Sequence, residues 1–341
     1  MKKLNLALAV LGTLAGTASA QTSISVYGIV DAGIVYESKS VANVANTLAG
    51  VPLDTSVLKL SSGVQSGSRV GFRGTEDLGG GLVAKFVLET GIAIDTGGFN
   101  QGGLAFGRQA YVGLGGNWGA VTLGRQYTPH YLALAEADPF GTGLAGNAQN
   151  LVTSVTRMNN TIKYTAPVWS GFVGELSYGF GEVADNNTAN RQYGAAIGYN
   201  NGPIVVKLAH HSADNATGTD HSRTTLLMGK YDFGMAAASL AFNNTQGIAG
   251  IDSRDYLVGV SVPLGAGTVL LSYISKDDRS ARNGDADQWA IGYTHAISKR
   301  TNFYTSFARI SNKNGANFTV GNAIDPGIGE QAFNIGVRHS F

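Results

Sequence analysis

Short runs in which polar and apolar residues alternate recur along almost the whole chain, and this pattern constrains the fold more than any other feature. In the run 68–74, Arg69 and Arg73 fall on one side of an extended strand, whereas Val70 and Phe72 fall on the other. A strand of this kind has one polar and one apolar face. Such a strand suits the wall of a barrel that has water inside and lipid outside.

About 16 runs of this kind can be counted, an even number, as in single-chain bacterial membrane barrels. We predict strands at 23–31, 68–74, 82–89, 106–114, 120–126, 155–165, 171–179, 192–199, 204–210, 223–233, 237–243, 255–262, 268–275, 288–295, 302–310 and 331–341. Short turns alternate with long polar connections along the chain. In an outer-membrane barrel the short turns lie on one side of the membrane and the long connections on the other. The predicted fold is therefore an all-β, transmembrane, antiparallel barrel of 16 strands.

The N-terminus has the three parts of a secretory signal peptide. Met1-Lys2-Lys3 is basic, residues 4–16 are apolar, and Ala18-Ser19-Ala20 forms an A-x-A cleavage site. We predict a signal peptide at 1–20 and one continuous domain at 21–341, because no Pro-rich, Ser-rich or charged linker divides the rest. No later segment approaches the roughly 18 apolar residues of a spanning helix.

Charge and cysteine content exclude several classes of function. Lys and Arg number 24 and Asp and Glu number 23, so nothing indicates a nucleic-acid partner. The count of cysteine is 0, which excludes disulfides, thiolate metal sites and cysteine nucleophiles. We predict no catalytic residues, no metal site and no cofactor.

One connection is too long and too irregular to be an ordinary loop. It runs from Arg125 to Arg157, with its central part at about 126–154, and it is rich in aromatic and aliphatic residues. Such a composition argues against disorder, because these side chains need a surface to pack on. We expect this third long loop to fold into the lumen of the barrel.

The chain resembles the general porins of Gram-negative outer membranes, of the kind common in β-proteobacteria. The matching segments span the chain: 25–31, 68–81 with Arg-Gly-Thr-Glu-Asp-Leu-Gly-Gly-Gly, 107–114, 124–126, 297–301 and 336–341. The resemblance implies a homotrimer in the bacterial outer membrane, surrounded by lipid and lipopolysaccharide and inserted by the outer-membrane assembly machinery. The terminal Phe341, which follows alternating apolar residues, looks like the assembly signal of such proteins.

The resemblance also implies where the pore is narrowest. A basic wall would face acidic groups of the inward loop. The expected wall residues are Arg69, Arg73, Lys85, Arg108, Arg125 and Arg157, and the expected loop residues are Glu136, Asp138, Pro139 and Phe140. Strict alternation puts Arg125 on the apolar face, so a bulge or strand end would be needed to turn it inward.

The predicted function is a water-filled channel for passive diffusion of small hydrophilic solutes and ions. Arginines that line a narrow pore favour anions, so we expect a modest anion preference. The same charges could instead pair with one another and only brace the loop.

The sequence leaves three other functions open: a substrate-specific channel, a barrel hydrolase and an adhesin. The pair His210-His211 points to opposite faces of a strand, which argues against a hydrolase, and His130 could line the pore or pack.

Overall fold

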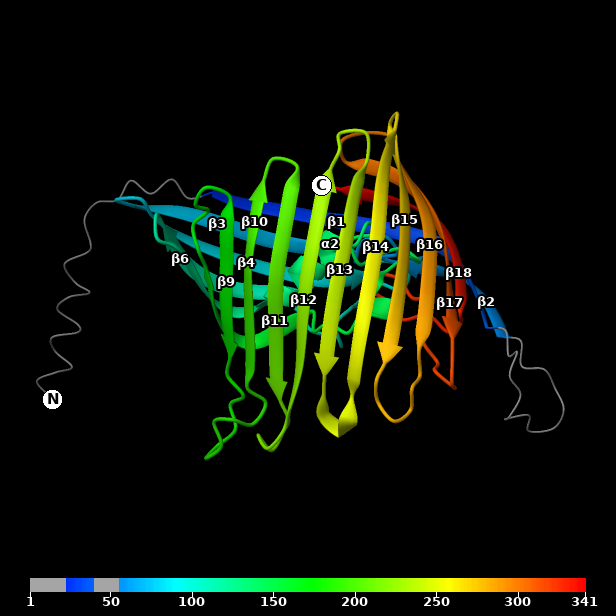
Figure 1. Cartoon of the computed structure of the whole chain (residues 1–341). Coiled ribbons are helices and arrows are strands. Elements are labelled where there is room, and N and C mark those ends of the chain that lie inside the picture. The colour runs from blue at the N-terminus through cyan, green and yellow to red at the C-terminus, as the bar shows by residue number, and fades with distance from the viewer. Residues whose placement is uncertain (1–22, 40–54) are drawn as a thin grey trace, which may run out of the picture.

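The computed structural model describes residues 23–39 and 55–341, so the predicted signal peptide and most of the first long connection lie outside the described residues. The described chain forms one closed, antiparallel β-barrel. Figure 1 shows the strands around a central space, with short turns at the upper rim and longer connections at the lower rim. No helix in these two ranges is long and apolar enough to cross a membrane.

The barrel has 16 strand positions, which are filled by 18 labelled strands. β2 and β3 pair with successive parts of β1 and together occupy one position, and β5 is a two-residue strand beside β4. The strands are β1 (Ser23–Lys39), β2 (Thr55–Ser62), β3 (Arg69–Gly79), β4 (Leu82–Ala93), β5 (Gly98–Phe99), β6 (Gln109–Gly116), β7 (Gly119–Tyr127), β8 (Arg157–Thr165), β9 (Phe172–Gly179), β10 (Gln192–Asn201), β11 (Ile204–Asp214), β12 (His221–Asp232), β13 (Ala237–Gln246), β14 (Asp252–Leu264), β15 (Gly267–Asp278), β16 (Ala286–Ala296), β17 (Thr301–Asn312) and β18 (Gln331–Ser340). The predicted fold class is confirmed.

Alternation along each strand separates the lipid side from the lumen. In β13, Leu240 and Phe242 point outward and are 62% and 36% exposed, whereas Ser239 and Asn243 point inward and are buried. The same pattern repeats around the barrel, so the large exposed apolar residues form an outer belt. Closure comes from ten cross-strand pairs between β1 and β18, which leave no open sheet edge there.

The break between β2 and β3 is a feature that alternation did not reveal. Residues 55–62 were not predicted as a strand, yet they pair with the second half of β1. The interruption at 63–68 is held by Asp31, whose Oδ2 accepts hydrogen bonds from the backbone N–H groups of Gln65 (2.9 Å) and Ser66 (2.6 Å). Asp31 Oδ1 accepts a third from the Tyr304 hydroxyl (2.6 Å).

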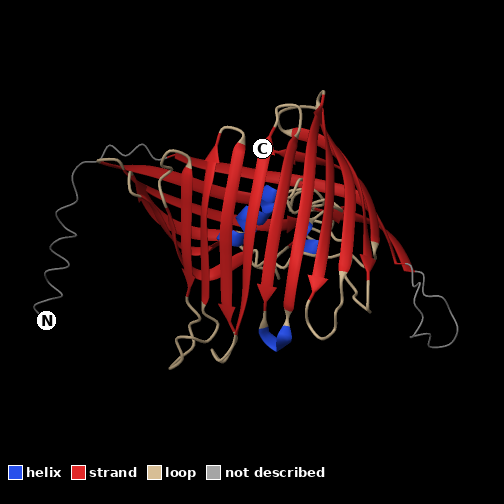
Figure 2. Ribbon diagram, in the orientation of Figure 1, coloured by secondary structure: helices blue, strands red, loops and turns tan. Residues whose placement is uncertain are grey.

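The connection from β7 to β8 folds into the barrel, as Figure 2 shows by the helices inside the wall. It contains α2 (Pro129–Ala137) and the 3-10 helix η1 (Ala148–Asn150). Thr128 caps α2, because its hydroxyl accepts the Tyr131 N–H at 3.0 Å, and Pro129 at the first turn has no N–H to satisfy. The main apolar core lies between this loop and the wall, where Leu134, Leu144 and Met228 are almost fully buried.

Candidate pore constriction

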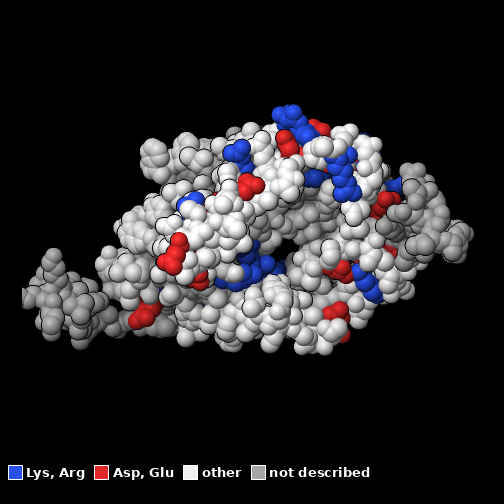
Figure 3. Space-filling view, turned by 90° about the horizontal axis from the view of Figure 1, so that it is seen from below, with Lys and Arg blue, Asp and Glu red and all other residues white. Residues whose placement is uncertain are grey.

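Three arginines at the beginnings of three different strands converge on one cavity inside the barrel. Arg69 begins β3, Arg108 directly precedes β6 and Arg157 begins β8. All three line a cavity of about 120 Å³, together with Tyr131 and Thr142 of the inward loop. Viewed from the side of the long connections, basic atoms gather beside the central opening (Figure 3). The barrel wall thus supplies the cations and the loop supplies the opposite, neutral side.

Two residues that the sequence prediction did not include hold these guanidinium groups in position. Arg108 Nε donates to Glu89 Oε1 at 2.8 Å, and both side chains are buried. Arg108 Nη2 and Arg157 Nη2 donate to the Tyr127 hydroxyl at 2.6 and 3.0 Å. The Arg157 guanidinium also lies 4.6 Å above the Tyr127 ring, and that ring stacks on Tyr131 at 5.3 Å.

The cavity has an excess of positive charge. Arg69 Nε donates to the backbone carbonyl of Gly67 at 2.8 Å, a neutral partner. None of the described residues that line the cavity is acidic. Glu89 stands behind Arg108 and offsets one charge, which leaves two of the three arginine charges uncompensated at short range.

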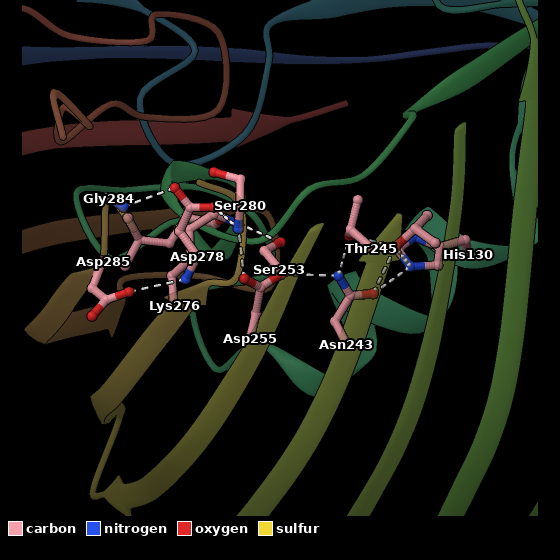
Figure 4. A network of polar contacts seen from close by, with 12 residues as sticks. His130, Asn243, Thr245, Ser253, Asp255, Lys276, Asp278, Ser280, Gly284 and Asp285 are labelled. Carbon is pink, nitrogen blue, oxygen red and sulfur yellow. Dashed lines mark hydrogen bonds and ion pairs between the residues drawn. The ribbon is translucent and has the colours of Figure 1, made fainter. Parts of the chain in front are cut away.

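The inward loop is fixed to the opposite wall by a buried polar network (Figure 4). His130 Nε2 lies 2.9 Å from Asn243 Oδ1, and Asn243 Nδ2 donates to Asp255 Oδ2 at 2.9 Å. Lys276 Nζ donates to Asp255 Oδ1 at 2.8 Å and to the carbonyl of Leu151 at 3.0 Å. Because Asn243 donates to Asp255, its Oδ1 must accept from His130, so the Nε2 of His130 carries the proton.

Burial lowers the pKa of His130 to about 4, which keeps the imidazole neutral in this network. Of the two roles considered for this residue, the structure therefore assigns packing and anchoring. His210 and His211 do point to opposite faces. His210 has the strand parity of the exposed Leu208, whereas His211 has the parity of the buried Ala209 and is itself 2% exposed.

The two loop acids do not face the arginines, so that expectation is wrong. Glu136 forms an ion pair with Lys207 at 2.5 Å. Asp138 is buried, and its two oxygens accept the backbone N–H groups of Phe140 (3.0 Å), Thr142 (2.9 Å) and Ala148 (2.9 Å). Burial raises the pKa of Asp138 to about 6 although these three bonds oppose the rise. The Asp138 carboxylate therefore fixes the conformation of the loop and does not set the electrostatic field of the cavity.

Pro139 and Phe140 also lie away from the cavity. Phe140 is 4% exposed, and its ring covers Gly146 and Gly292. Pro139 packs over Gly259 of β14. Both therefore anchor the loop to the wall. Their apolar side chains fill space that only glycine leaves open on the inner face.

The remaining predicted wall residues lie outside the cavity. Arg73 and Lys85 border a separate cavity toward the short turns. Arg73 lies four residues after Arg69 in β3, which is about 13 Å along the strand. Arg125 sits at a bulge, where the pairing of β7 with β8 shifts register between Gly124 and Gln126. Its Nε donates to the carbonyl of Gly107 at 2.7 Å, and its Nη1 donates to Asn159.

Residues 23–39 and 55–341 contain no group of three His, Cys, Asp or Glu side chains that could hold a metal ion.

Comparison with known proteins agrees with this architecture. A family model described as Gram-negative porin matches residues 7–315. The chain is 35% identical to outer membrane porin protein 32 of Delftia acidovorans and 32% identical to an outer membrane porin protein of Bordetella pertussis, with 100% of each chain covered. Among solved structures, an anion-selective porin from Comamonas acidovorans has a TM-score of 0.78 and 30% identity, covering 94% of this chain and 100% of the other. The chain belongs to the Gram-negative porin family.

Proposed function

We propose that this porin forms a water-filled channel for passive diffusion of small hydrophilic solutes and ions, with a modest preference for anions. The observation that carries the proposal is the convergence of Arg69, Arg108 and Arg157 on one cavity whose described lining has no carboxylate. Low-dielectric walls focus the field of such a cluster, so a few charges outweigh a nearly neutral total. The similar Comamonas protein is described as anion-selective, which supports the same direction.

The arrangement also indicates which arginines test the proposal best. Arg108 is buried against Glu89, so its removal would leave a carboxylate unpaired in a buried site. Arg69 and Arg157 have no ion-pair partner in the described part of the chain and point their charge at the cavity. The test variant is therefore Arg69→Gln with Arg157→Gln, which keeps polar side chains of similar length.

The measurement is the reversal potential across a KCl gradient in a planar bilayer. The double variant should lose most of the anion preference, because each guanidinium stabilises an anion and repels a cation. Arg73→Gln is the matched control, since it removes a charge from the same face of the same strand outside the cavity. An unchanged reversal potential in the folded double variant, or an equal loss in the control, would exclude the arginine wall as the selectivity element.

We further propose that the mature protein begins at Gln21 and assembles as a homotrimer in contact with lipid and lipopolysaccharide. The outer belt of exposed apolar side chains supports burial in lipid or against other subunits. Mass spectrometry of the purified protein would test the cleavage site. Unheated electrophoresis in SDS would test the trimer, which should migrate at about three times the heated mass.

Phe341 is our candidate signal for the outer-membrane assembly machinery. Its backbone exchanges two hydrogen bonds of 3.1 Å with Gly28 of β1, so it sits at the seam where the barrel closes. Phe341→Ala should lower the amount of protein inserted in cells without changing the conductance of the channels that do insert. Normal insertion would exclude this role.

A further inference from the structure

The last long connection, residues 313–330, also bends into the barrel. Ala323 and Ile324 line the same cavity as Arg69 and Arg108, although they are more than 200 residues away in sequence. The connection is therefore not only an external loop. It contributes apolar side chains to a site whose other walls are polar.

Glycines in the break between β2 and β3 allow this close approach. A Cβ on Gly67 would lie 2.7 Å from Ile324 Cδ1 and 2.8 Å from Arg108 Nη1. A Cβ on Gly63 would lie 2.8 Å from Ile324 Cγ1. Ile324 and the Arg108 guanidinium thus both pack against the backbone of Gly67, and Ile324 narrows the cavity beside the guanidinium.

On one side an ionic contact holds the tip of this connection, defined as residues 321–325, to the wall. Lys59 of β2 forms an ion pair with Glu37 of β1 at 2.7 Å and a second one with Asp325. Glu37 is buried and its Oε2 also accepts the backbone N–H of Ile328 at 2.9 Å. Lys59 therefore links the wall to the residue that follows Ile324.

On the other side the tip is bound to the inward third loop. Asn147 Nδ2 donates to the carbonyl of Asn322 at 3.0 Å, and Asn150 Oδ1 accepts the N–H of Gly321 at 3.0 Å. The Asn322 side chain closes the turn itself, because its Oδ1 accepts the N–H groups of Ile324 and Asp325 at 3.0 Å. The tip is thus bound to the wall on one side and to the third loop on the other.

We propose that this tip is a third wall of the constriction, that Ile324 sets its width, and that the Lys59–Asp325 contact latches it. The inference rests on the proposed channel function. An isoleucine side chain offers no hydrogen bond to a hydrated ion, so it excludes water from the side of the cavity nearest Arg108. A narrower, drier cavity strengthens the field of the arginines.

Because the chain has no cysteine, a single introduced thiol can report on the tip. Ile324→Cys is treated in the bilayer with a methanethiosulfonate that adds a small neutral group, and single-channel conductance is compared before and after treatment. Ile328→Cys is the matched control, since this residue lies on the same connection, is 44% exposed and does not line the cavity. Mass spectrometry measures the labelled fraction in both variants.

We expect labelling of Ile324→Cys to lower conductance by about twofold or more, and labelling of Ile328→Cys to leave it unchanged. Asp325→Asn should have the opposite effect, with larger and more variable current steps, because its amide then faces the Lys59 ammonium. A fully labelled Ile324→Cys channel with unaltered conductance, or a thiol that the reagent does not reach, would overturn the proposal. If no variant conducts at all, the channel function itself fails, which is a separate result.

Discussion

Glu89 provides the most informative single test of the constriction, because removing its charge should strengthen selectivity rather than weaken it. Glu89→Gln is nearly isosteric. The new amide oxygen can still accept from Arg108 Nε, and the new amide N–H can donate to the Tyr27 hydroxyl, which now donates to Glu89 Oε2 at 2.9 Å. The variant therefore removes one negative charge beside Arg108, which raises the net charge of the site by one, while both heavy atoms of the new amide keep a partner.

The magnitude follows from the distance of this charge from a passing ion. From the Glu89 carboxylate to an ion on the far side of the Arg108 guanidinium, the distance is about 7 Å, which is roughly the width of a guanidinium plus the lengths of two hydrogen bonds. At about 7 Å a unit charge in water contributes about 0.6 kcal/mol, and screening in 0.1 M salt reduces this to about 0.3 kcal/mol. The effect has opposite signs for anion and cation, so the anion-to-cation permeability ratio should rise roughly three- to eightfold.

The assay is the reversal potential of Glu89→Gln channels in a KCl gradient, measured at 0.1 M and again at 1 M salt. The rise should shrink at high salt, because the screening length falls from about 10 Å to about 3 Å. Glu175→Gln is the matched control, since Glu175 pairs with Lys163 at 2.8 Å outside the arginine cavity. A ratio that stays constant or falls in Glu89→Gln would refute the electrostatic reasoning.

Three further predictions concern the same region. Asp325→Asn should increase current fluctuations more at low salt than at high salt, because the latch to Lys59 is ionic; equal fluctuations in wild type would contradict the latch. Tyr127→Phe should broaden the distribution of conductance levels in single-channel records, since two guanidinium groups lose their common acceptor; a single unchanged level would argue against this positioning role. The pKa of His130 is lowered to about 4, so the stability that depends on its neutral form is complete above about pH 6.5 and is lost as pH falls toward 4, on the order of 3 kcal/mol. The pKa of Asp138 is raised to about 6, so its protonation between pH 6 and pH 3.8 removes the cost of a buried carboxylate and offsets most of that loss. Between about pH 6.5 and pH 4 the free energy of unfolding of His130→Gln should therefore rise relative to that of wild type, by on the order of 3 kcal/mol. Thermal unfolding in detergent measures this difference, and a parallel pH dependence of the two proteins would contradict the assignment.

The sequence predicted the barrel well because alternation and loop length are local signals. The strand at 55–62 was not predicted. It is separated from the strand at 69–79 by a break of six residues, and the two form one strand position only because both pair with β1. Arg125 shows the same limit. The bulge beside Gly124, with φ of +133°, depends on pairing between strands and cannot be read from alternation in one strand.

The site was predicted only in part for a different physical reason. The inward loop was expected from the length and composition of its segment, and the basic wall from the resemblance, with partial support from strand parity. The partner of each charge, however, depends on three-dimensional distance. Glu136 and Asp138 are the two acidic residues of the third loop, whereas Glu89, which lies outside that loop, is the acid that pairs with an arginine of the cavity. Tyr127 could have been noticed from its position at the end of β7, directly before the loop, but nothing in the sequence indicates that two arginines share its hydroxyl.

A nearly neutral chain can still present a positive cavity because the carboxylates inside the barrel have other partners. Asp138 accepts three backbone N–H groups, Glu136 pairs with Lys207, and Asp255 pairs with Lys276 where the loop is anchored. Each of these groups is held where it stabilises the loop, and none lines the arginine cavity. The contacts that stabilise the loop therefore also keep its carboxylates away from the arginine wall. It follows that variants which free a loop carboxylate should lower anion preference even when every arginine is intact.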